Sequence, residues 1–110
     1  MKDIMGLMKQ AKEMQKKMQI AQGLVADIVV AGSSGSGLVT IELAGGGNMK
    51  TLKIHPSLFG SSEQDDIEMA EDLIVAAYQD AKIKLDEATA QTMKDTVGDI
   101  PLPPGMNLPL

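Results

Sequence analysis

Apolar side chains recur near the start of the chain at the spacing of a coiled-coil seam, and this repeat constrains the fold most. The repeating positions, separated by 3, 4, 3, 4 and 3 residues, are Ile4, Leu7, Ala11, Met14, Met18 and Ala21. This a/d spacing predicts a helix over residues 4–22 with one narrow apolar stripe. Because a single narrow stripe needs a partner helix, we expect a dimer interface formed by Ile4, Leu7, Ala11, Met14 and Met18.

The opposite face of this helix carries a stripe of lysines. Lys2, Lys9 and Lys16 share heptad position f, with Lys12 beside them. Residues 1–22 hold five Lys and two acids, whereas residues 63–99 hold eleven acids and three Lys, so the net charge of −5 hides a basic segment. All ten basic residues are Lys, which binds phosphate but lacks the planar fork with which Arg reads guanine. The stripe fits either DNA phosphates or an ordinary solvated face.

The rest of the chain predicts three strands and a second helix. Residues 25–31, 38–43 and 50–55 are rich in β-forming residues, and glycine-rich turns of hairpin length join them. Gly23 is expected to end the first helix, and Pro56 to stop the third strand. An acidic start and a broad apolar stripe predict a helix from about 63 to 96. The fold class is therefore α+β: an N-terminal helix, a three-stranded antiparallel meander and a long C-terminal helix.

Residues 1–97 are expected to form a single domain, and the Pro- and Gly-rich residues 98–110 a flexible tail. The chain has no Cys, which fits a reducing cytosol. Lysines interrupt every apolar run near the N-terminus, and no apolar stretch is long enough to span a bilayer. We therefore expect a cytoplasmic protein without contact to a membrane.

The sequence offers little catalytic chemistry. His55 is the only imidazole, so a general base would have neither a Cys nor a second His beside it. The glycine-rich loop at 32–37 lacks the Gly-Lys-Ser/Thr ending of a P-loop, and the acids after residue 62 lack the spacing of a calcium loop. We expect no enzyme, no cofactor and no metal site.

Five segments in order resemble the YbaB/EbfC family of bacterial nucleoid-associated proteins. The segments are LMKQAKEMQKKM at 7–18, GSGLV at 35–39, IHPSL at 54–58, EDLIVAAYQDA at 71–81 and LPPGM at 102–106. His55 stands where the family usually has Asp. The resemblance covers essentially the whole chain.

The resemblance implies a homodimer in which two sheets and the long helices join, while helical arms project like tweezers and bind double-stranded DNA. It implies a location at the bacterial nucleoid. The DNA-binding candidates that it gives are Lys9, Lys12, Lys16, Lys17, Lys82 and Lys84, and periodicity adds Lys2. An alternative is a protein-interaction module that grips a helix of a replication or recombination protein without touching DNA. Steep salt dependence of binding would favour DNA.

Overall fold

The computed structural model describes residues 2–60 and 62–98. Helix α1 (Lys2–Ala26) leads into strands β1 (Val29–Ser34), β2 (Val39–Ala44) and β3 (Met49–Ile54), and helix α2 (Gln64–Val97) follows. Short 3-10 turns lie at Gly35–Gly37 and Pro56–Phe59. The predicted α+β class and the predicted order of elements are confirmed. Residues 99–110 lie outside the described range, so a domain boundary at 97/98 stays a prediction.

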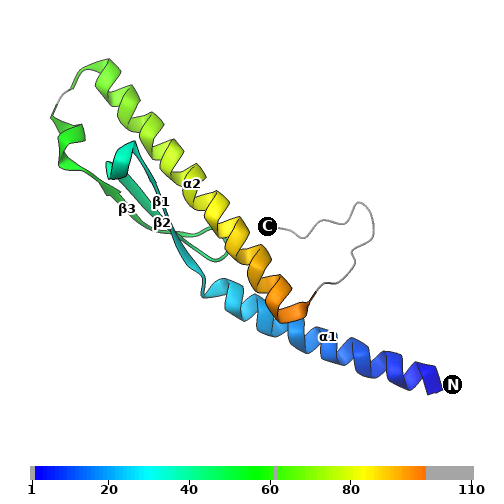
Figure 1. Ribbon diagram of the computed structural model, residues 1–110. Helices are drawn as coiled ribbons and strands as arrows, with labels where there is room; N and C mark the ends of the chain where they lie inside the picture. The colour runs from blue at the N-terminus through cyan, green and yellow to red at the C-terminus, as the bar shows by residue number, and fades with distance from the viewer. Residues whose placement is uncertain (1, 61, 99–110) are drawn as a thin grey trace.

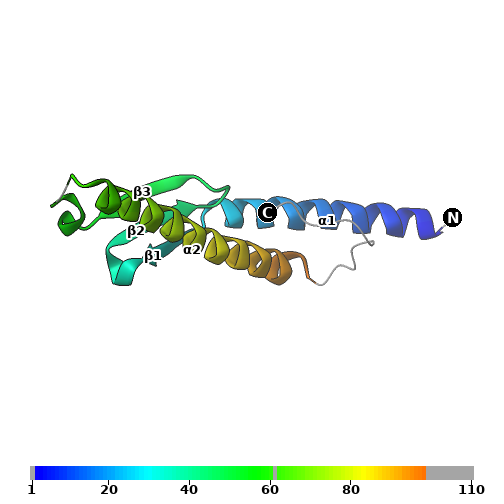
Figure 2. The ribbon, with the colours of Figure 1, turned by 90° about the horizontal axis from the view of Figure 1, so that it is seen from above.

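The molecule is long and thin, measuring 74 × 26 × 17 Å. The three strands form one antiparallel sheet in the order β1-β2-β3, and α2 lies along one face of it, over β1 and β2 (Figure 1). Helix α1 leaves the sheet at the opposite end from the start of α2 and extends past the end of α2 (Figures 1 and 2). The N-terminal part of α1 therefore projects from the packed sheet and α2, which together we call the body.

The core lies between α2 and the central strand. Val39, Ile41 and Leu43 alternate along β2, as the sequence predicts, and are fully buried. They pack against α2 at Ala77, Ala81 and Leu85. The helix approaches the sheet closely because β1 carries no side chain at Gly32, where a Cβ would lie 2.2 Å from the backbone nitrogen of Ala81.

Three element boundaries differ from the prediction by three residues or more: the end of the first helix and both ends of the first strand, because β1 extends to Ser34 into the predicted loop at 32–37. The expectation that Gly23 ends the first helix was wrong, because α1 continues to Ala26 and β1 begins only at Val29. One helical glycine costs about 1 kcal/mol relative to alanine, which packing can offset. Here the last turn of α1 rests on the β2–β3 turn at Gly45, where a Cβ would lie 1.8 Å from the carbonyl oxygen of Val25. The Gly45 N–H also donates to Ile28 O over 2.8 Å.

The outer edge of β1 is closed by side chains of α2. The Ser33 N–H donates to Asp80 Oδ2 at 3.0 Å, and Lys84 Nζ donates to the Ala31 carbonyl at 3.3 Å. Lys84 Nζ also lies 3.0 Å from Asp80 Oδ2. The Ser33 hydrogen bond, and after it Lys84, lowers the pKa of the Asp80 carboxyl. Together the two side chains satisfy backbone groups that an edge strand otherwise leaves open to another chain.

Two glycine substitutions should act in opposite directions. Gly32→Ala places a methyl group inside the backbone of α2 and should lower the free energy of unfolding by about 2 kcal/mol or more. Gly23→Ala adds a methyl group in open space within a helix and should raise it by up to about 1 kcal/mol. Urea denaturation of both variants measures this. Equal stability of the Gly32→Ala variant and the parent would show that the helix–sheet contact is looser than described.

Asp80 should make stability depend on pH in the acid range. Because its pKa is lower in the folded chain, its charge stabilises the fold fully above the unfolded pKa of about 3.9, and this contribution disappears as the pH falls through the folded pKa. Asp80→Asn should therefore be less stable than the parent at pH 6 and approach it near pH 3. Urea denaturation across that range tests this, with Asp72→Asn on the exposed side of α2 as the control. A parent–variant difference that stays constant down to pH 3 would exclude a role for the charge.

Candidate nucleic-acid interface

Exposure of the α1 seam decreases from the tip of the helix toward the body. Ile4 and Leu7 are 60% and 63% exposed, whereas Met14 and Met18 are half-buried and Ala21 is fully buried. The end of α2 meets α1 over this second half (Figure 1). Part of the predicted dimer seam is thus covered within the chain, and Ile4, Leu7 and Ala11 remain accessible. We call residues 2–17 of α1 the arm.

Four lysines stand exposed on the arm: Lys9, Lys12, Lys16 and Lys17. Lys9, Lys12 and Lys16, which are separated by three and four residues, share one side of the helix. Among the side chains of residues 4–60 and 62–98, none of these four ammonium groups forms an ion pair with a carboxylate. The backbone of Lys2 begins α1, but its side chain lies outside the described part. The arm therefore presents at least four positive charges that a phosphate can approach.

The two candidate lysines on α2 have a different environment. Lys82 Nζ lies 2.6 Å from Asp86 Oδ1, and Lys84 is held by Asp80 and the edge of β1. Both positions lie over the body, away from the arm. The structure thus does not bring Lys82 and Lys84 together with the arm lysines, and each would have to leave an acidic partner to bind phosphate.

Acidic side chains gather at the other end of the molecule. The first turns of α2 and the residue before them carry Glu63, Asp65, Asp66, Glu68, Glu71 and Asp72. This end of α2 lies farthest from the N-terminus of α1 (Figure 1). Screening at physiological salt has a length of about 8 Å, so acids this far away barely weaken the field at the arm. Charge is therefore separated along the long axis of the protein.

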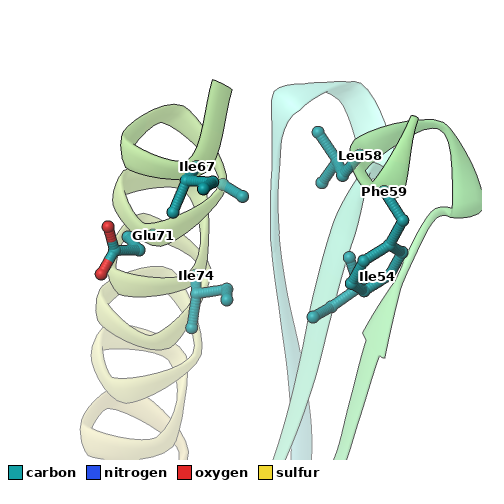
Figure 3. Close-up of a pocket in the computed structure, with 7 residues that line it drawn as sticks. Ile54, Leu58, Phe59, Ile67, Glu71 and Ile74 are labelled. Atoms are coloured by element: carbon teal, nitrogen blue, oxygen red, sulfur yellow. The ribbon is translucent and has the colours of Figure 1, made fainter. Parts of the chain in front are cut away.

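An apolar groove lies beside this acidic end, between α2 and β3. Ile67 and Ile74 of α2 face Ile54, Leu58 and Phe59 across a pocket of about 230 Å³ (Figure 3). On β3, Leu52 stands opposite the fully buried Ile41 of β2, yet Leu52 is 43% exposed because α2 does not reach it. We call the apolar surface formed by Leu52, Ile54, Phe59, Ile67 and Ile74 the β3 groove. The periodicity of the sequence did not single it out, although an isolated Phe59 shortly after the third strand was a signal.

His55 has a structural role. Its Nδ1 accepts a hydrogen bond from the Ser57 N–H at 3.1 Å and lies 2.8 Å from Ser57 Oγ. The His55 side chain thereby caps the start of the Pro56–Phe59 turn. An Asp carboxylate can accept the same kind of hydrogen bond from the backbone. Within the residues that the structure describes, no three side chains of metal-ligating type converge, and no helix is both long and apolar enough to cross a bilayer.

Comparisons with known proteins identify the family of the chain. The model of the YbaB/EbfC DNA-binding family matches residues 1–100. Nucleoid-associated proteins of Rhizobium meliloti and Gluconobacter oxydans are each 50% identical over 109 residues, which cover 99% of both chains. Among solved structures, HP0035 of Helicobacter pylori aligns with a TM-score of 0.67 over 84% of this chain and 94% of that one. At 22% identity, that likeness shows the fold alone. From the match along nearly its whole length, the chain belongs to the YbaB/EbfC DNA-binding family.

Proposed function

We propose that this protein binds double-stranded DNA as a homodimer, through the lysines of its two arms, and acts at the bacterial nucleoid without catalysis. The observation that carries this proposal is the exposure of Lys9, Lys12, Lys16 and Lys17 on a helix that projects from an otherwise acidic body. Membership of a DNA-binding family supports it.

Electrostatics favours the arm over every other surface. A protein gains affinity for DNA by displacing counterions from phosphates, and each lysine that meets a phosphate contributes. The net charge of −5 opposes binding to DNA, but the acids at the start of α2 lie at the far end of a 74 Å molecule. The DNA therefore meets a positive surface at the arm. Because Arg is absent from the chain, we expect only modest preference for sequence.

A homodimer would bring two arms to one duplex. One arm that makes about three phosphate contacts binds weakly, whereas a second arm on the same particle binds at a high effective concentration. Doubling the number of lysines would raise affinity without any new kind of contact. This is our reason for attributing DNA binding to the dimer.

The β3 groove is the surface that best fits a second copy of this chain. Its β3 side continues the core face of the sheet, because Leu52 lies in register with the buried Ile41, yet within residues 2–60 and 62–98 no helix or strand covers it. Phe59 and Ile67 extend the same apolar surface, with exposed fractions of 72% and 43%. Burial of such a surface against a copy leaves both arms projecting. The accessible seam at Ile4, Leu7 and Ala11 is the alternative interface.

The first test reverses the charge of the arm. The parent should lose affinity with rising salt at a log–log slope near −5, as expected for about six neutralised phosphates. Lys9→Glu, Lys12→Glu and Lys16→Glu together should abolish binding and leave the fold intact, because exposed substitutions cost within about 0.5 kcal/mol each. Fluorescence anisotropy on a duplex at several salt concentrations measures both quantities.

Lys53→Glu, exposed on β3, is the control for nonspecific charge and should change affinity little. A triple variant that binds DNA like the parent would place the DNA surface elsewhere. A parent without salt-dependent binding would favour the protein-interaction alternative.

The second test separates the two dimer surfaces. Leu52→Asp and Ile67→Asp together should convert the dimer to a folded monomer of about half its mass, because a carboxylate in an apolar contact loses its hydration. Leu7→Asp should leave the dimer intact. Sedimentation equilibrium at micromolar concentration distinguishes these outcomes. Dissociation by Leu7→Asp alone would assign the interface to the α1 seam.

A further inference from the structure

One apolar residue lies within the lysine stripe of the arm. Met5 precedes Lys9, Lys12 and Lys16 by 4, 7 and 11 residues, which is the spacing of side chains on one helix face. Met5 is 77% exposed, more than any other large apolar side chain among the described residues. The face proposed for DNA therefore carries a methionine at its outer end.

The coiled-coil seam does not account for Met5. Successive residues of a helix are about 100° apart, so Met5 lies on roughly the opposite side of the helix from Leu7. A partner that covers Ile4, Leu7 and Ala11 would leave Met5 in solvent. A dimer through the β3 groove would also leave it exposed, because the groove lies at the other end of the molecule (Figures 1 and 3).

Resting on the DNA binding proposed above, we propose that Met5 enters the major groove and contacts the 5-methyl group of thymine. A helix about 10–12 Å across matches a major groove about 12 Å wide. The lysines on the same face bring the helix to the phosphates on either side. On the floor of that groove the thymine methyl is the apolar group, and the unbranched thioether of Met5 adapts its shape to it.

This contact gives a chain without Arg a way to distinguish sequences. Lysine contacts to phosphate position the helix without reading bases, whereas a methyl contact depends on where thymine lies. The preference would be modest, because one buried methyl group changes affinity by about fourfold for each arm. Most of the affinity would come from lysine–phosphate contacts and would not depend on sequence. The methyl contact would add a preference for duplexes rich in A·T pairs.

The test replaces thymine by uracil throughout a duplex. Uracil pairs in the same way and leaves every phosphate in place, but it lacks the 5-methyl group. Because the dimer brings one Met5 per arm to the duplex, the parent should bind the uracil duplex roughly fifteenfold more weakly than the thymine duplex. Met5→Ala should bind the two duplexes equally and keep the salt slope of the parent. Val75→Ala shortens an apolar side chain that is 56% exposed on α2, away from the arm, and should keep the discrimination of the parent.

Each outcome of this test either supports or excludes the contact between Met5 and the thymine methyl group. Salt-dependent binding of the parent without a thymine–uracil difference overturns this inference alone and leaves the proposed function standing. The same difference in the parent and in Met5→Ala also overturns it, because another group then reads the methyl. Absence of salt-dependent binding by the parent overturns the proposed function as well. Circular dichroism of Met5→Ala confirms that the helix is retained.

Discussion

The close contact of α2 with β1 at Gly32 determines the arrangement of the whole body. Only a residue without a side chain allows the backbone of α2 to approach the sheet at Ala77 and Ala81. This approach buries Val39, Ile41 and Leu43 in a thin core and holds Asp80 and Lys84 over the outer edge of β1. Because the helix is centred over β1 and β2, it cannot also cover β3. The apolar β3 groove, our proposed dimer surface, is therefore a consequence of the contact that stabilises the monomer.

A second glycine directs the arm. Gly45 lets the β2–β3 turn lie against the last turn of α1, so the helix leaves the sheet at the end opposite the acidic start of α2. The arm lysines are thereby separated from the six acids at the start of α2. An acidic protein can present a basic surface to DNA in this way, because electrostatic interactions in physiological salt weaken within about 8 Å.

The sequence predicted the features that depend on local periodicity. The alternation of Val39, Ile41 and Leu43 and the exposure of Lys9, Lys12 and Lys16 both follow from the spacing of residues along one element. Features that depend on how elements meet were not predictable. Heptad spacing cannot tell a partner helix in the same chain from one in another chain, so the half-burial of Met14 and Met18 beside α2 was not foreseen. For the same reason Lys82 and Lys84 looked equivalent to the arm lysines until their partners Asp86, Asp80 and Ala31 were in place.

The nine methionines of the chain allow a direct measurement of where DNA binds. Met5 and Met8 report on the arm, whereas Met49 and Met69 report on β3 and α2. In a protein labelled with ¹³C at the methionine methyl groups, a DNA duplex should shift the NMR signals of Met5 and Met8, and added salt should reverse the shift. The signals of Met49 and Met69 should stay in place. A salt-dependent shift confined to Met49 and Met69 would contradict the assignment of DNA binding to the arm.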